Sequence, residues 1–238
     1  MRIYNLLSKP GKKLVLLIDP EKYTIPALIA TLYAAEEVKI TLILVGGSLV
    51  SNRIDSTIEI INKHTTIPVV LFPGSLMQLS NKADAILLLS LISGRNPDYL
   101  IGNHVLAAPF LKKSGLEVIP TGYILIGEGN RTAVEYISNT IPIPSDKQDL
   151  VIATAVAGEL MGNKLIYIES GSGANCPAHP DLIREIRRNI SLPLIVGGGI
   201  REPEQAYEIS RAGADIIVVG NAIENNIDVL GPLMKAIG

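Results

Sequence analysis

The sequence predicts an α/β fold, a (β/α)₈ (TIM) barrel formed by one domain over residues 1–238. Short aliphatic runs recur along the whole chain, and amphipathic helical stretches lie between most of them. The runs are continuous rather than alternating in hydrophobicity, which is typical of parallel strands covered on both faces. Eight such runs in a chain of 238 residues favour a closed barrel over a doubly wound open sheet, the second candidate.

The predicted strands are the aliphatic runs at residues 14–18, 41–45, 67–71, 85–89, 117–126, 164–168, 192–196 and 215–219. The predicted helices carry apolar residues three and four positions apart, at residues 25–38, 52–64, 99–113, 146–161, 180–189, 203–212 and 229–237. Only residues 72–84 separate the third strand from the fourth, so we expect the third helix to be short or missing.

Composition and charge exclude several classes of protein. Hydrophobic residues make up 47% of the chain and tryptophan is absent, so we expect a mainly aliphatic core. The net charge of −2 and the lack of a basic-aromatic pattern argue against binding to nucleic acid. The single cysteine, Cys176, excludes an intramolecular disulfide and is typical of a reducing compartment such as the cytoplasm. The apolar run at residues 14–18 is too short for a signal peptide or a membrane span.

Glycines follow the last two predicted strands, as Gly197-Gly198-Gly199 and as Gly220-Asn221. In parallel barrels the loops after the seventh and eighth strands are the usual phosphate site, because bare backbone lets an anion approach the N–H groups. The alternative is that these glycines only form tight turns.

The sixth strand supplies the candidate for acid–base chemistry. Side chains alternate along a strand, so Tyr167 and Glu169 share one face while Ile166 and Ile168 share the other. The isoleucines suit the helix layer, which directs Tyr167 and Glu169 toward the mouth of the barrel. A carboxylate there needs a task or a partner, so the alternative is an ion pair with a basic residue across the mouth.

Two further strand ends carry polar side chains at the same edge. Asp19 ends the first run, where a carboxylate can bind magnesium or act as a base. It could instead cap the next helix, although Thr24 competes for that role. Ser48 ends the segment Gly46-Gly47-Ser48 after the second run, which a simple turn would also explain.

Five segments together resemble the geranylgeranylglyceryl phosphate synthase family, whose relatives include the heptaprenylglyceryl phosphate synthases of Gram-positive bacteria. They are IDPEK at 18–22, VGGS at 45–48, YIESGSG at 167–173, VGGGI at 196–200 and VGNA at 219–222. The segments occur in the family's order over nearly the whole chain. The longer loop after Glu169 and the helix after Gly94-Arg95-Asn96-Pro97 are more similar to the second of the family's two main groups (group II).

The resemblance implies a prenyltransferase that joins sn-glycerol 1-phosphate to geranylgeranyl diphosphate or a similar long-chain prenyl diphosphate, with Mg²⁺ (magnesium) as cofactor. By position, Asp19 and Ser48 would bind the metal, and Glu169 and Tyr167 would be catalytic. Glycerol 1-phosphate would be held by Tyr167, Ile168, Glu169, Ser170, Gly171, Ser172, Gly173, Gly198, Gly199, Gly220 and Asn221.

A long prenyl tail needs an apolar groove, and Tyr99, Leu100 and Tyr123 are candidates for its wall, with ordinary core packing as the alternative. The family forms dimers and hexamers, so we expect a homo-oligomer. A membrane-dissolved substrate suggests transient peripheral membrane contact of a cytoplasmic protein. Two other functions stay open: a different phosphate-binding barrel enzyme, an isomerase or an FMN-dependent oxidoreductase, and a non-catalytic barrel that binds polyprenyl phosphates.

Overall fold

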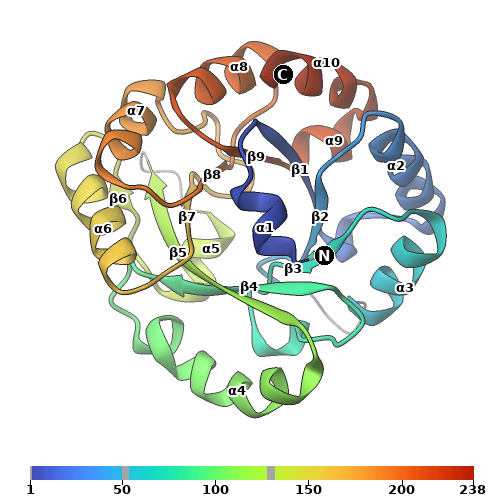
Figure 1. Cartoon of the computed structure of the whole chain (residues 1–238), viewed down its shortest axis with the longest axis horizontal. Coiled ribbons are helices and arrows are strands. Elements are labelled where there is room, and N and C mark those ends of the chain that lie inside the picture. The colour runs from blue at the N-terminus through green and yellow to red at the C-terminus, as the bar shows by residue number, and fades with distance from the viewer. Residues whose placement is uncertain (1, 50–53, 128–131) are drawn as a thin grey trace.

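The computed structural model describes residues 2–49, 54–127 and 132–238, and a closed parallel barrel runs through them (Figure 1). Its strands are β1 (Lys13–Ile18), β2 (Leu42–Val45), β3 (Val69–Leu71), β4 (Ala85–Leu91), β5 (Glu117–Gly127), β7 (Leu165–Glu169), β8 (Leu194–Gly197) and β9 (Ile216–Val219). Each pairs with the next in parallel and β1 pairs with β9, which closes the cylinder. The predicted barrel is confirmed. A further short strand, β6 (Ile143–Pro144), pairs in parallel with the last two residues of β5.

Helices surround the barrel, and one of them, α1, closes its amino-terminal end. They are α1 (Ile3–Ser8), α2 (Ile25–Glu37), α3 (Ile54–His64), α4 (Asn103–Ser114), α5 (Ala133–Ser138), α6 (Gln148–Leu160), α7 (Pro180–Asn189), α8 (Pro203–Ala212), α9 (Asn221–Asn225) and α10 (Leu230–Ile237). Between β3 and β4 there is only the 3₁₀ turn η2 (Leu76–Gln78). This confirms the expectation that the barrel helix after the third strand is short or missing. The first two residues of the predicted helix 52–64 lie outside the described residues.

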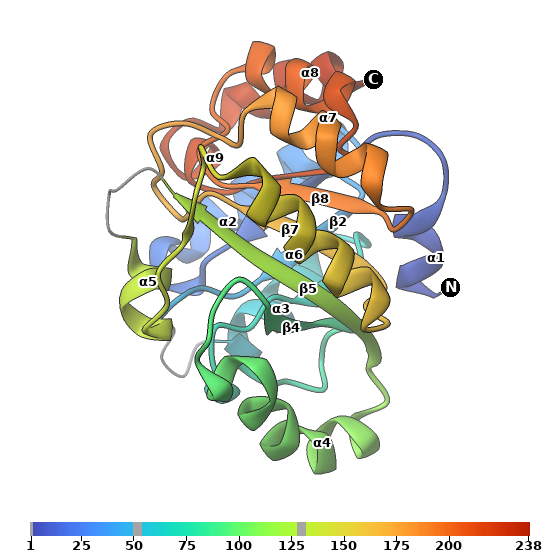
Figure 2. The ribbon, with the colours of Figure 1, turned by 90° about the vertical axis from the view of Figure 1, so that its left-hand side faces the viewer.

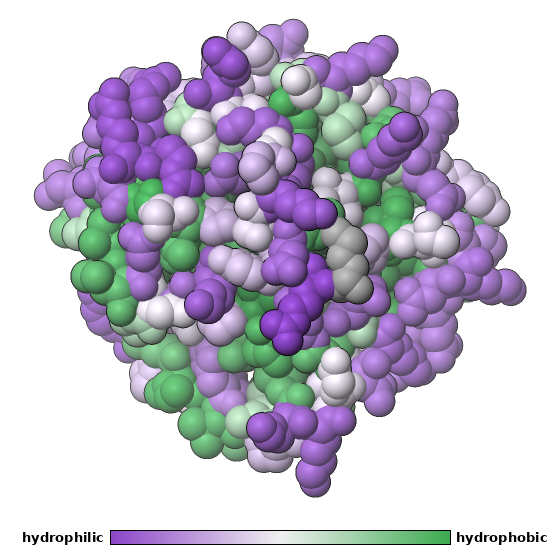
Figure 3. All heavy atoms as spheres, in the orientation of Figure 1, coloured by the Kyte–Doolittle hydropathy of each residue, from purple (hydrophilic) through white to green (hydrophobic). Residues whose placement is uncertain are grey.

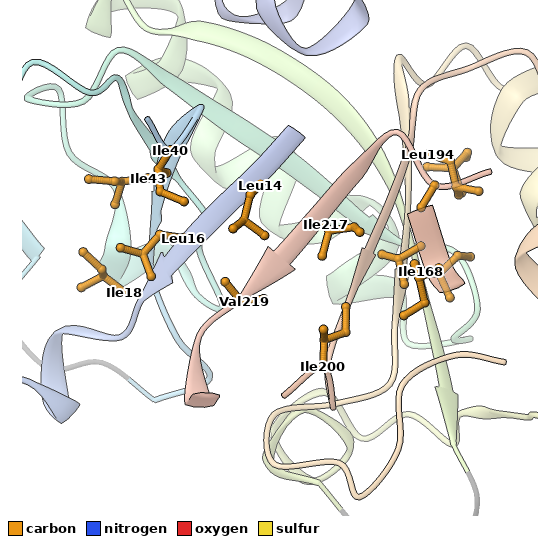
Figure 4. Close-up of a cluster of buried hydrophobic side chains, with 14 of the residues drawn as sticks. Leu14, Leu16, Ile18, Ile40, Ile43, Ile168, Leu194, Ile200, Ile217 and Val219 are labelled. Carbon is orange, nitrogen blue, oxygen red and sulfur yellow. The ribbon is translucent and has the colours of Figure 1, made fainter. Parts of the chain in front are cut away.

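Both faces of the strands are buried, which explains their continuous apolar character. Alternate side chains pack inside the barrel, as Val15, Tyr167 and Val218 do. The intervening ones pack outward against the helices, where Leu14, Leu16, Ile217 and Val219 of neighbouring strands form one layer (Figure 4). The sixth predicted strand follows this alternation, because Ile166 and Ile168 face the helices and Tyr167 faces the interior.

The helix α1 closes the amino-terminal end of the barrel. It lies across the centre of the ring in Figure 1, and Figure 2 shows it at the end opposite α5 and α9. Its Ile3 and Leu7 are buried in the interior cluster. The Glu117 carboxylate at the start of β5 accepts hydrogen bonds from the Ile3 and Tyr4 amides, the second at 3.1 Å. The carboxyl ends of the strands therefore form the open mouth.

Within the described ranges, every helix is too short or too polar to reach across a lipid bilayer.

Replacing Leu7 with alanine should lower the free energy of unfolding by about 2–5 kcal/mol, because it leaves a cavity in the barrel floor where the side chain is 3% exposed. Urea unfolding followed by circular dichroism measures this. The same change at Leu160, which is 82% exposed, should stay within about 0.5 kcal/mol of the original chain. Equal effects of the two substitutions would contradict the role assigned to α1.

Candidate active site at the barrel mouth

The mouth opens into a cavity of about 340 Å³ that is lined by residues from the carboxyl ends of almost all the strands. Twelve of the predicted site residues line it: Asp19, Ser48, Tyr99, Tyr123, Tyr167, Glu169, Ser172, Gly173, Gly198, Gly199, Gly220 and Asn221. The topology thus brings together groups that are up to 202 positions apart in the chain.

Four other predicted site residues do not line the cavity. The Ile168 side chain is buried in the outer layer, since it alternates with Tyr167, and Leu100 packs against the same layer. The Ser170 hydroxyl is buried and has no hydrogen-bond partner among the described residues. Gly171 acts through its backbone, because its N–H donates to Glu169 Oε1 at 2.7 Å.

Glu169 is a carboxyl group buried inside an apolar barrel, with only 5% of the residue exposed. Burial raises its pKa to about 7, and the hydrogen bond from the Gly171 N–H opposes the shift. In the part of the chain that the structure describes, no lysine or arginine forms an ion pair with it, so the alternative of a salt bridge across the mouth finds no support. A pKa near neutrality lets this group take up or release a proton.

Three aromatic rings form the inner wall beside Glu169. Tyr167 stacks on Phe72 with ring centroids 5.3 Å apart, and Tyr123 lies 5.3 Å from Tyr167 at an angle of 45°. Burial and the neighbouring Glu169 raise the pKa of Tyr167, which keeps its hydroxyl protonated. That hydroxyl lies close enough to Glu169 to lower the pKa of the carboxyl group, although it forms no well-aligned hydrogen bond in the described ranges.

Gly198 allows the loops after β7 and β8 to approach each other. Its φ of +83° is in the left-handed region, and a β-carbon there would overlap Glu169 Oε1 and lie 2.9 Å from the Ser170 and Gly171 nitrogens. Only glycine fits this position. The glycine-rich end of β8 is therefore needed to place its backbone against the buried carboxylate.

The loops after β1 and β2 meet at Asp19. Its Oδ1 accepts from the Glu21 N–H at 3.1 Å, capping the 3₁₀ turn η1 (Pro20–Lys22), whereas Thr24 caps α2. Its Oδ2 faces Gly47, where a β-carbon would lie only 2.7 Å away. Burial raises the pKa of Asp19. The carboxylate is thus held against the segment that carries Ser48.

Gln78 supports this segment, and the sequence contains no signal for it. The side chain is fully buried; its Nε2 donates to Gly47 O at 2.7 Å, and its Oε1 accepts from the Gly47 and Gly74 amides at 3.2 Å each. Gln78 belongs to the turn η2, which occupies the place of a barrel helix between β3 and β4. One amide side chain therefore fixes the loops after β2 and β3.

Asp19 and Ser48 offer oxygen ligands of the kind that Mg²⁺ takes. Magnesium is usually bound by one or two carboxylates, with phosphate oxygens and water completing its shell. In the described portion of the chain no cluster of three His, Cys, Asp or Glu side chains could hold a metal ion by itself. The residues therefore fit a magnesium ion that shares its ligands with a phosphate-bearing molecule.

Polar side chains that sequence reasoning missed also line the cavity. Lys22 and Glu224 form an ion pair of 3.1 Å at the rim, and Glu224 also accepts from Asn221 Nδ2 at 3.2 Å. Deeper in, His104 Nε2 lies 3.0 Å from Ser90 Oγ. Lys22 stands in the recognised IDPEK segment, but a single sequence does not reveal that Glu224, from the other end of the chain, lies beside it.

Comparison with known proteins gives full-length matches. The model of the PcrB family matches residues 9–237. The geranylgeranylglyceryl phosphate synthase of Chitinophaga pinensis is 51% identical, with 99% of this chain and 96% of the relative covered. That of Spirosoma linguale is 46% identical, with coverage of 100% and 95%. The crystal structure of (S)-3-O-geranylgeranylglyceryl phosphate synthase from Thermoplasma acidophilum in complex with its substrate sn-glycerol-1-phosphate is 33% identical, with a TM-score of 0.94 and coverage of 100% and 98%.

The raised pKa of Glu169 predicts a pH-dependent stability. Between the ordinary value of 4.5 and about 7 the folded chain keeps this proton while the unfolded chain loses it, so the free energy of unfolding falls as pH rises. The total fall is about 3 kcal/mol at most. Glu169→Gln should lack this fall and unfold at a higher free energy than the original chain at pH 8.

Urea unfolding at several pH values between 4 and 8 makes the comparison. Glu185→Gln is the matched control, because Glu185 is 40% exposed on α7 and pairs there with Arg188. Its pH dependence should equal that of the original chain. An unchanged slope in Glu169→Gln would show that this carboxyl does not titrate as described.

Proposed function

The chain belongs to the PcrB family, and from this premise we propose that it is a prenyltransferase, a geranylgeranylglyceryl phosphate synthase. It joins sn-glycerol 1-phosphate to geranylgeranyl diphosphate, or a similar long prenyl diphosphate, and forms a prenylglyceryl phosphate ether and diphosphate. The observation that carries the proposal is the buried Glu169 in a cavity whose whole barrel superposes, at a TM-score of 0.94, on a relative with bound sn-glycerol-1-phosphate. The three relatives described above are all geranylgeranylglyceryl phosphate synthases, which favours this function over the other candidates.

Glu169 is the general base of the proposed reaction. The glycerol oxygen attacks the allylic carbon as the bond from that carbon to the diphosphate oxygen breaks, and the diphosphate leaves with the electron pair. The hydroxyl proton passes to the Glu169 carboxylate, whose pKa of about 7 suits a base at neutral pH. The protonated Tyr167 hydroxyl orients the nucleophile.

The aromatic wall suits the charge that develops on the prenyl fragment. Ring faces attract cations, and Phe72, Tyr123 and Tyr167 stand together beside Glu169. The buried setting also keeps water away from an allylic cation. The rings thus support the same carbon that the glycerol oxygen attacks.

Backbone at the glycine-rich strand ends holds the phosphate of glycerol 1-phosphate. Gly198, Gly199 and Gly220 line the cavity, and Ser172 Oγ donates to Asn221 Oδ1 at 3.2 Å, which joins the loops after β7 and β9. Fixing the phosphate selects the hydroxyl that reaches the allylic carbon. Such positioning contributes up to about 7–11 kcal/mol in well-oriented reactions.

Asp19 and Ser48 are the proposed ligands of Mg²⁺. When bound, the ion neutralises negative charge on the diphosphate that departs. The charges of the cavity support this: its described lining carries the carboxylates of Asp19, Glu169 and Glu224 against the basic side chains of Lys22 and Arg201. An added cation would offset part of the negative charge that two phosphate-bearing substrates bring to this lining.

The prenyl chain would lie in the part of the cavity that residues of β4 and α4 line. Leucines at positions 88, 89 and 91 line it together with Tyr99 and Tyr123. Each methylene that leaves water there contributes about 0.8 kcal/mol. Leu100 does not line the described cavity, so its place in the groove stays a prediction.

Assembly and location complete the proposal. Hydrophobic residues gather over α4 at the lower edge of Figure 3, where Val105 and Leu106 are more than 60% exposed, and this supports a homo-oligomer, a dimer or hexamer. Leu49 and Met77 are exposed in loops that follow β2 and β3 at the mouth, which supports transient contact with a membrane that supplies the prenyl substrate. The single cysteine supports a cytoplasmic location.

Incubation with sn-glycerol 1-phosphate, radiolabelled geranylgeranyl diphosphate and magnesium should yield a labelled ether that resists phosphatase at its prenyl bond. The rate should rise with pH through about 7, because Glu169 must lose its proton to act as base. Glu169→Gln should lower kcat roughly 100- to 10,000-fold. Absence of the ether with any prenyl length would reject the proposed function, and a full rate in Glu169→Gln would reject the base.

Removal of magnesium with EDTA should stop ether formation, and added Mg²⁺ should restore it. Asp19→Asn should raise the magnesium concentration needed for half-maximal rate at least about 10-fold, because an amide replaces a charged ligand. Magnesium titrations of the rate measure this. A rate that survives EDTA, or an unchanged titration in Asp19→Asn, would exclude this metal site.

A further inference from the structure

Four side chains form a continuous line of polar contacts across the rim of the barrel. Ser172 Oγ donates to Asn221 Oδ1 at 3.2 Å, Asn221 Nδ2 donates to Glu224 Oε2 at 3.2 Å, and Lys22 Nζ lies 3.1 Å from the same Glu224 oxygen. The contacts join the loop after β7, the helix α9 after β9 and the turn η1 after β1. All four residues line the cavity. The line therefore connects the glycerol phosphate loops with the loop that carries Asp19.

Glu224 is the centre of this line. Its side chain is 13% exposed, against 36% for Lys22, and burial raises its pKa while the Lys22 ammonium opposes that shift. Because Glu224 accepts from Asn221 Nδ2, the carboxamide must direct its oxygen toward Ser172. One carboxylate thus sets the orientation of an amide that would otherwise be free to flip.

The same carboxylate holds a basic group beside Asp19. Lys22 ends the turn η1 that Asp19 caps, and its ammonium would swing freely on a flexible stem without a partner. The other basic side chain in the described lining, Arg201, donates to Ala174 O at 2.9 Å in the loop after β7. Lys22 is therefore the ammonium that an anion beside Asp19 would meet.

We propose that Glu224 is a positioning residue that holds Lys22 as a binding group for the diphosphate of the prenyl substrate and orients Asn221 for glycerol 1-phosphate. The inference rests on the proposed function, because that function identifies the two anions as the diphosphate of the prenyl substrate and the phosphate of glycerol 1-phosphate. The incoming diphosphate takes hydrogen bonds from the Lys22 ammonium, while Glu224 keeps Asn221 in place. Glu224, which lies outside the recognised segments, thereby supports the binding of both substrates.

Two substitutions of Glu224 separate the two tasks. Glu224→Gln keeps an oxygen for Asn221 Nδ2 but loses the charge that holds Lys22, so it should raise KM for the prenyl diphosphate roughly 10-fold and leave KM for glycerol 1-phosphate within about twofold. Glu224→Ala should raise both. Lys22→Gln should reproduce the first pattern, and adding Glu224→Gln to it should have little further effect.

Calorimetric binding of inorganic diphosphate in the presence of magnesium provides a readout without turnover. Its affinity should fall roughly 10-fold in Glu224→Gln and in Lys22→Gln, and stay unchanged in the control Glu185→Gln. The proposal would be overturned by an unchanged diphosphate affinity in Glu224→Gln. It would also be overturned if Glu224→Gln raised both KM values equally and lowered the free energy of unfolding. If the original chain forms no ether but these affinities still fall, the proposed function fails, whereas the role of Glu224 in holding Lys22 for a diphosphate group is retained.

Discussion

The arrangement of the barrel mouth depends on keeping one carboxyl group, that of Glu169, away from water. An ionised carboxylate inside an apolar core is costly, and the fold compensates with the Gly171 N–H and a pKa near neutrality rather than with a salt bridge. The bare backbone of Gly198 packs against the carboxylate where any side chain would collide. The glycine-rich strand end and the buried acid are therefore a single structural unit.

The rest of the mouth is held by side-chain amides rather than by a complete ring of helices. In place of a helix between β3 and β4, Gln78 forms hydrogen bonds to the loops after β2 and β3. Asn221 links the loop after β7 to α9. Such contacts keep loops in register while leaving backbone groups facing the cavity. The proposed activity needs both properties, because two anionic substrates and a metal ion must meet within a few ångströms.

Most of the barrel and much of its mouth could be predicted from the sequence. Continuous aliphatic runs locate the eight strands to within two residues at each end, and strand alternation correctly directs Tyr167 inward. The helix α1 has too little periodicity to be recognised alone, because it forms by packing on the barrel floor. Gln78 and Glu224 each depend on one partner that is remote in the chain, Gly47 and Lys22 respectively. Leu100 differs from its neighbour Tyr99 in the face that it presents. Those features follow from tertiary contacts that local patterns do not contain.

Because α1 closes the amino-terminal end of the barrel, the cavity in the described part of the chain opens at the carboxyl ends of the strands. A molecule that binds against the inner aromatic rings must therefore reach them from the mouth, past the loops that follow the strands. The six residues of α1, Ile3 to Ser8, thus determine which end of the barrel a ligand can enter.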